Sequence, residues 1–364
     1  MDRKLAVRLL IAAALVLLAA VLYYLRQPTS AADSTSPQAA SSVSNATQAG
    51  AADTVISNLR TELQSGQAGQ PELDALRQRL LSLPPEEAIA EIRAFLATGQ
   101  DTALRSEFAI GEGGALEGAP SLRVFLLDLL GQISRRSGSD AGAQLAREIL
   151  QEKTSADEWA VSLRNVAWHD PNAKPYLAGK MREMLAHEPW LQRPSDGFLE
   201  TFDVIVYTAD PTFVPQLADL RENGPDDVQR AAAIAMDRLS EVAPLQVMTY
   251  LNSNPTEYAD RPMLRADFYA KADLTVPEQR AALETYLSRQ DVGVDEKTKL
   301  IRALATPTSF VSDNLVTQNP PPGDDLTRLQ HYGTVLQEWQ QQSRFPQLQN
   351  EIARMSGRIA AQIR

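Results

Sequence analysis

Apolar residues recur every three or four positions along most of this chain from about residue 53, the spacing that places them on one face of an α-helix. The clearest apolar stripe lies between Ser121 and Ile133 and consists of Leu122, Phe125, Leu126, Leu129, Leu130 and Ile133. Val124 and Leu127 widen this stripe, so the sequence predicts a helix that is buried on most sides.

The same pattern predicts many further helices of ordinary length. They cover 140–152, 155–168, 172–187, 196–208, 211–222, 225–242, 244–253, 262–272, 277–289 and 295–305, with Pro, Gly, Asn or Asp at most of the breaks. No segment reads as a strand, because the β-like run at 202–208 lacks period-two alternation and follows a good helix start. The predicted fold class is therefore all-α.

One stretch, from Phe213 to Leu239, resembles a HEAT repeat. It has a first helix, a short turn at Asn223, Gly224 and Pro225, and a second helix. The core stripe expected on the second helix is Val228, Ala232, Ala235, Leu239 and Val242. No regular period repeats along the chain, so the resemblance is at the level of fold. It implies a HEAT-like or TPR-like α-solenoid of stacked antiparallel helix pairs over residues 53–305.

The end of the chain is set apart from this helical run. Residues 306–323 form a Pro-rich connection, and 324–364 contain two helical stretches with apolar stripes. We interpret these stretches as a hairpin that covers the open end of the solenoid. The alternative is a small coiled-coil interface through which the chain associates with itself.

An uninterrupted apolar run at 9–25 is long enough to span most of a bilayer core. Arg3, Lys4 and Arg8 precede it, so the positive-inside rule places residues 1–8 in the cytoplasm and the body outside, in the periplasm of a Gram-negative source. A cleaved signal peptide is the alternative, with a small-residue site at 29–31. Residues 26–52 are rich in Ser, Thr and Ala and predict a flexible tether.

Composition and charge exclude several classes of function. The formal net charge is −11, which disfavours nucleic acid as a partner because phosphates need cationic contacts. The chain has no cysteine, which excludes disulfides and thiolate chemistry. Its three histidines do not show the spacing of zinc ligands on a helix, and no cofactor motif is present.

The strongest catalytic candidates are His169 and Asp170, which follow Trp168. Helix-end packing explains His169 better than general-base chemistry does, and Asp170 is placed to cap the next helix, which begins near Pro171. We therefore predict no catalytic residue and no metal site, and keep His169 and Asp170 as an alternative.

A glycine-rich loop is the best candidate for binding. It contains Gly111, Glu112, Gly113, Gly114, Glu117 and Gly118. A phosphate-binding loop needs a preceding strand and a following Lys, and neither is expected here. We interpret Gly111 as the left-handed residue that ends a helix over 105–110. The remaining glycines exceed what one cap requires, which predicts close approach by another backbone or by a partner.

Together these features favour a membrane-tethered scaffold that binds a protein or peptide partner without catalysis. The order of anchor, linker and helical body also resembles the layout of lipase-specific foldases, which implies a tethered chaperone as an alternative. Those foldases carry an R-x-x-F-D-Y motif, and residues 199–204, LETFDV, lack its Arg and Tyr. An all-α envelope enzyme that uses carboxylates is the third hypothesis.

Overall fold

The computed structural model describes residues 55–304, 313–318 and 325–363. The predicted cytoplasmic segment, the apolar run at 9–25 and the Ser-rich tether at 26–52 lie outside these residues. Within the described ranges, no helix is both long and apolar enough to cross a membrane.

The described part of the chain is all-α, apart from one small β-hairpin. Residues 55–65 are helical. The first half of the remaining helices is α3 (Gln70–Ser82), α4 (Pro85–Ala97), α5 (Leu122–Ser137), α6 (Ala141–Ile149), α7 (Ala156–His169), α8 (Lys174–Leu185), α9 (Glu188–Gln192), α10 (Asp196–Glu200) and α11 (Phe202–Thr208). The second half is α12 (Val214–Asn223), α13 (Asp226–Val242), α14 (Pro244–Ser253), α15 (Pro262–Tyr269), α16 (Pro277–Ser288), α17 (Val294–Ala303), α18 (Asp325–Gln341) and α19 (Gln349–Ile363).

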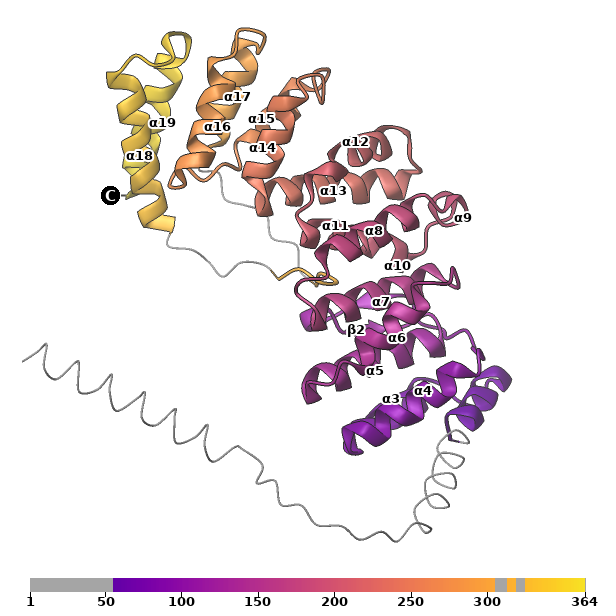
Figure 1. Ribbon diagram of the computed structural model, residues 1–364. Coiled ribbons are helices and arrows are strands. Elements are labelled where there is room, and N and C mark those ends of the chain that lie inside the picture. The colour runs from indigo at the N-terminus through magenta and orange to yellow at the C-terminus, as the bar shows by residue number, and fades with distance from the viewer. Residues whose placement is uncertain (1–54, 305–312, 319–324, 364) are drawn as a thin grey trace, which may run out of the picture. The chain divides into compact units, whose positions relative to one another are not determined.

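Helices that follow each other in sequence pack in pairs, and the pairs stack side by side (Figure 1). α6 packs on α7, α12 on α13 and α18 on α19, while α5 with α7, α8 with α11 and α15 with α17 join successive pairs. The helix starts follow from local chemistry. Ser121 Oγ accepts the N–H of Val124 at the start of α5, and Gly138 ends that helix with a φ of 70°. The prediction of many stacked helices is confirmed, and this arrangement is compatible with a helical-repeat fold.

The stretch that resembles a HEAT repeat forms the antiparallel neighbours α12 and α13. The predicted stripe on α13 is buried at Val228, Ala232, Ala235 and Leu239. Val242 is half exposed, so its place in the stripe was wrong. It is the last residue of α13, where the chain turns at Ala243 into α14.

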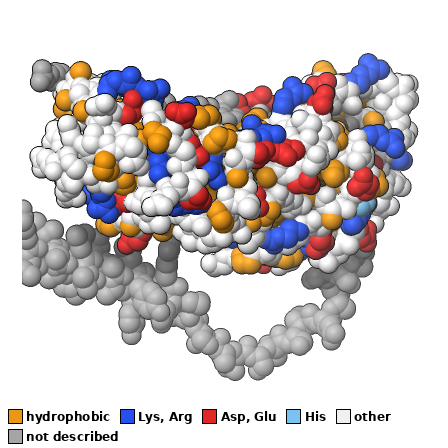
Figure 2. All heavy atoms as spheres, turned by 90° about the horizontal axis from the view of Figure 1, so that it is seen from above, with side chains coloured by type: hydrophobic (Ala, Val, Ile, Leu, Met, Phe, Trp, Pro, Cys, Tyr) orange, Lys and Arg blue, Asp and Glu red, His pale blue; other side chains and the backbone are white. Residues whose placement is uncertain are grey.

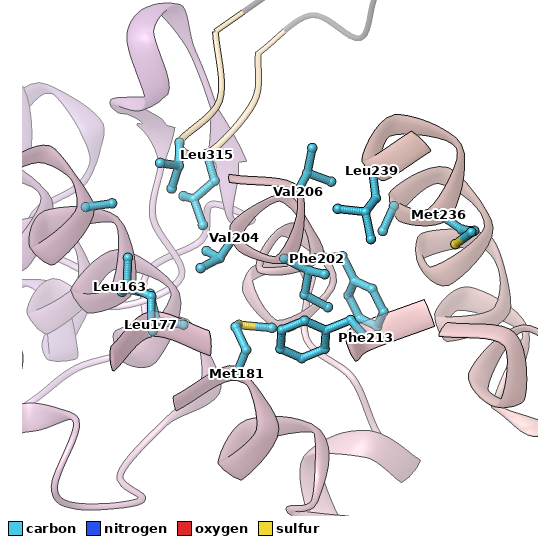
Figure 3. Close-up of a cluster of buried hydrophobic side chains, with 14 of the residues drawn as sticks. Leu163, Leu177, Met181, Phe202, Val204, Val206, Phe213, Met236, Leu239 and Leu315 are labelled. Carbon is cyan, nitrogen blue, oxygen red and sulfur yellow. The ribbon is translucent and has the colours of Figure 1, made fainter. Parts of the chain in front are cut away.

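The core is continuous across the stacked helices. Figure 3 shows one of its clusters, in which Leu163 of α7 and Met181 of α8 lie with Phe202 of α11 and Leu239 of α13. At the C-terminal end of the stack, α19 packs on α17, and Trp339 Nε1 of α18 donates to Glu284 Oε1 of α16 at 2.6 Å. The terminal hairpin thus joins the stack directly. Self-association through 324–364 stays a prediction.

The glycine-rich loop differs from the expectation. Residues 105–110 are not helical, and a short antiparallel hairpin of β1 (Ala109–Ile110) and β2 (Leu116–Gly118) forms instead, with the 3-10 turn η1 (Glu112–Gly114) between its strands. Gly111 is not left-handed, since its φ is −115°, whereas Gly113 and Gly114 have φ values of 68° and 84°. The helix and cap predictions were wrong because contacts with residues distant in sequence, Arg164 and Leu315, hold this loop.

Candidate functional site

A bent, non-helical segment from the loop between α17 and α18 docks on the middle of the stack. We call residues 313–318 the strap. Figure 1 shows the strap beside α7 and α11, away from the two helices that flank it in sequence. Its contacts reach α11, α13 and the glycine-rich loop. The strap is thus a short peptide of this chain that binds to a surface formed by residues much earlier in the sequence.

The carboxylate of Asp203 on α11 holds the backbone of the strap. Its Oδ2 accepts the N–H groups of Val316 at 2.7 Å and of Thr317 at 2.8 Å. Its Oδ1 accepts Thr317 Oγ1 at 2.5 Å and Arg238 Nη1 of α13 at 2.7 Å, and a second Arg238 nitrogen donates to the Thr317 hydroxyl. The Asp203 side chain is only 5% exposed. A buried carboxylate requires such partners, and the strap supplies most of them.

The apolar side of the strap fills a gap in the core. Leu315 is fully buried and belongs to the cluster of Figure 3, and Val316 is also buried. Gly114 lies under this part of the strap, where an added Cβ would stand 2.4 Å from the carbonyl oxygen of Leu315. Glycine at 114 is therefore required both by its positive φ and by the approach of a second backbone.

A buried ion pair fixes the glycine-rich loop from beneath. Arg164 Nη1 of α7 donates to the carbonyl oxygen of Gly114 and to Asp128 Oδ1 of α5, both at 2.7 Å. Asp128 Oδ1 also accepts the N–H of Leu116 at 3.1 Å. Burial lowers the pKa of the Arg164 guanidinium, and the adjacent Asp128 carboxylate opposes that effect. The loop is thus a rigid wall of the site that holds the strap.

A pocket of about 360 Å³ opens beside the strap, between α10, α11 and α13. Its lining combines apolar and charged side chains from Leu199, Glu200, Phe202, Asp203, Asp227, Arg230, Ala231, Ile234, Ala235, Arg238 and, from the strap, Asn314. Burial, together with the nearby Asp203 and Asp196, raises the pKa of the Glu200 carboxyl. On the face shown in Figure 2, Lys and Arg side chains are interspersed with Asp and Glu and form no patch of a single sign.

The loop residues predicted from the sequence do not converge on a ligand. Gly111 gives room to the Glu117 side chain, and Gly118 gives room to the carbonyl oxygen of Glu107. Glu112 and Gly113 line a second pocket of about 420 Å³ together with Arg135 and Trp168. Most of these glycines therefore serve packing within the chain, and the binding of a partner by this loop stays a prediction.

His169 and Asp170 have separate partners. His169 Nδ1 contacts the carbonyl oxygen of Asn165 at 2.8 Å, and its Nε2 is buried with no hydrogen-bond partner. Asp170 pairs with Arg147 at 2.7 Å and accepts the N–H of Asn172 at 3.0 Å. Neither set of contacts forms a catalytic pair. Across the part of the chain that the structure covers, no group of His, Asp and Glu side chains could hold a metal ion.

Sequence reasoning missed Asp203 and Arg238, the residues that hold the strap. One signal was available, because Asp203 is a single charge within the apolar run FDVIVYT of α11. A carboxylate in such a run is buried and must find donors, but the sequence does not say where those donors come from.

Comparisons with known proteins do not narrow this picture: no family model, no curated protein and no solved structure matches the chain.

Proposed function

We propose that this protein is a membrane-tethered, extracytoplasmic scaffold of the HEAT-like α-solenoid type. It binds a bent, non-helical segment of a partner protein at the surface that the strap occupies. The observation that supports this is the docking of the strap itself through two backbone N–H groups on Asp203. A surface that holds one bent peptide by its backbone suits another of similar shape.

The contacts indicate what such a segment needs. Adjacent N–H groups of an extended strand point to opposite sides, so only a peptide that bends as the strap does directs two of them to one carboxylate oxygen. Asp203 therefore recognises a bent backbone without proline at those two positions, and the contacts of Thr317 Oγ1 with Asp203 and Arg238 add a preference for a hydroxyl side chain at the second of them. The buried site of Leu315 adds a preference for an aliphatic side chain, whose burial contributes about 1.5–3 kcal/mol. A partner therefore competes with the strap, which is linked to the site and has an effective concentration on the order of millimolar.

The predicted anchor at 9–25 and the tether at 26–52 support a role beside a membrane. A flexible tether of this length reaches about 28 Å, so the site would search for partners close to the bilayer. A tethered chaperone remains the alternative, and a refolding assay with secreted client proteins separates it from a scaffold.

Site-directed photo-cross-linking in intact cells tests the proposal. A photoreactive amino acid replaces Ile234, which is 52% exposed in the pocket beside the strap, and the control replaces Val294 on α17, which is 51% exposed. Leu315→Asp is introduced to release the strap, and Gln318→Asp adds the same charge at an exposed strap position.

We expect Leu315→Asp to increase cross-linking of a partner segment at position 234 and not at 294. A synthetic peptide of that segment should bind the Leu315→Asp chain and lose binding when Asp203 is also changed to Ala. Equal yields with and without the strap released, or equal yields at both positions, would show that the strap surface is not the binding site.

A further inference from the structure

The strap forms part of one wall of the 360 Å³ pocket, and this pocket is open to solvent. Asn314 of the strap lines the pocket, which places the residue just before the buried leucine at its edge. The apolar part of the lining comes from Leu199, Phe202, Ala231, Ile234 and Ala235. Ile234 is 52% exposed, so a large aliphatic side chain of the lining is open to solvent.

The acidic side chains that line this pocket outnumber the basic ones. Asp203 pairs with Arg238 at 2.7 Å, and Asp227 pairs with Arg230, so both arginines are engaged. Glu200 makes no ion pair with any residue that the structure describes, and its pKa is raised by burial and by neighbouring carboxylates. The lining therefore carries one acidic group in excess, next to an apolar surface.

We propose that this pocket selects a lysine or arginine in the partner segment, at the position that Asn314 holds in the strap. This inference rests on the proposed function, and it specifies the kind of residue that the partner segment carries. The aliphatic stem of the basic residue packs on Ile234 and Leu199, and its charged end pairs with Glu200. The next residue of the segment, an aliphatic one, takes the site of Leu315.

The strap itself has no basic residue at this position. It places Asn314 at the pocket and has the acidic Asp313 immediately before it. An acidic residue beside a pocket with excess negative charge weakens the binding of the strap. The strap is thus an occupant that a basic partner segment can replace, in spite of its covalent link to the site.

Fluorescence anisotropy with synthetic peptides tests this selection. The protein is the full chain in detergent with Leu315→Asp, and a second variant replaces residues 314–317 by Gly-Ser-Gly-Ser in case the first does not fold. The labelled peptides copy residues 311–320, either unchanged or with Asn314→Lys or Asn314→Glu.

We expect the lysine peptide to bind about tenfold more tightly than the unchanged peptide, and the glutamate peptide to bind more weakly, since a factor of ten corresponds to one charge-assisted contact of about 1.4 kcal/mol. Glu200→Gln in the protein should remove the gain. Glu278→Gln, an exposed position on α16 outside the pocket, should leave it intact.

The outcomes separate this inference from the proposed function. If the unchanged peptide binds but lysine gives no gain, or if Glu278→Gln removes the gain as fully as Glu200→Gln does, the selection of a basic residue is wrong and the peptide site stands. If no peptide binds either strap variant, the proposed function itself fails.

Discussion

Two aspartate–arginine pairs in this protein perform the same task with different consequences. Asp128 with Arg164, and Asp203 with Arg238, each have an N–O distance of 2.7 Å. In each pair the carboxylate also accepts backbone N–H groups of a segment outside the helices, Leu116 in the first case and Val316 with Thr317 in the second. Both pairs thus attach non-helical chain to the helical stack.

The difference lies in where the partners come from. The side chains of Asp128 and Arg164 are 0% exposed, and the loop that they hold directly precedes α5. Arg238 is 13% exposed, the strap is 113 residues from Asp203, and an open pocket adjoins it. We therefore assign the first pair to the permanent core, and we propose that the second holds a segment that leaves without unfolding of the helices. The same aspartate–arginine contact thus stabilises either core structure or a docked segment, depending on its burial and on where its partners lie in the sequence.

Removal of one member of the core pair should have the largest effect. Arg164→Ala leaves the Asp128 carboxylate buried without its cation, and we expect the free energy of unfolding to fall by about 3–5 kcal/mol in urea titrations. The double variant Arg164→Met with Asp128→Leu should recover most of this loss. A small effect of Arg164→Ala alone would show that this pair is not part of the permanent core.

The strap pair should respond more weakly and locally. Asp203→Ala removes the acceptor of the two strap N–H groups, and we expect a loss of about 1–3 kcal/mol. Hydrogen exchange followed by mass spectrometry should show faster exchange in the strap, with protection in α5 and α7 kept. Asp227→Ala, which breaks an exposed pair on α13, should change stability by less than about 0.5 kcal/mol. Loss of protection throughout the helices of the Asp203 variant would contradict the distinction between the two pairs.

Two adjacent glycines in the glycine-rich loop test whether the strap rests on that loop. Gly113 and Gly114 both have positive φ, so alanine at either position should cost about 1 kcal/mol in backbone strain. Only Gly114 faces the strap, since a Cβ at Gly113 meets no atom within 4 Å. Gly114→Ala should therefore also accelerate hydrogen exchange in the strap, and Gly113→Ala should not. Equal exchange in the two variants would indicate that the strap does not rest on this loop.

The smallest expected effect is the pH-dependent contribution of Glu200 to the stability of the fold. The folded state raises the pKa of Glu200, so the charged form is disfavoured on folding and costs stability above that raised pKa. Glu200→Gln removes the cost and should raise stability at neutral pH by less than about 1 kcal/mol, because the group is partly solvated. The gain should vanish as the pH falls below the ordinary pKa of a glutamate, where both states are protonated. Thermal melts at neutral and acidic pH measure it, and a gain that persists in acid would rule out this origin.

Most helices could be predicted because their signals are local. Proline at or just before the helix start, together with apolar spacing of three and four, places α13, α14 and α16 almost to the residue. The hairpin at 109–118 could not be predicted from local signals, because Arg164 and Asp128 stabilise it from two different helices. The sequence predicted that either another backbone or a partner would approach the glycine-rich loop. The backbone that does so belongs to Leu315 of the same chain.

The sequence by itself determined the all-α class, the position of the helices and the surplus of glycine before α5, since each depends on residues close together in the chain. Only the tertiary structure decided that the strap crosses back to α11, that Asp203 receives it and that a pocket opens beside it. These features depend on contacts across 113 residues, and a carboxylate carries no sequence signal for the donor that it will meet.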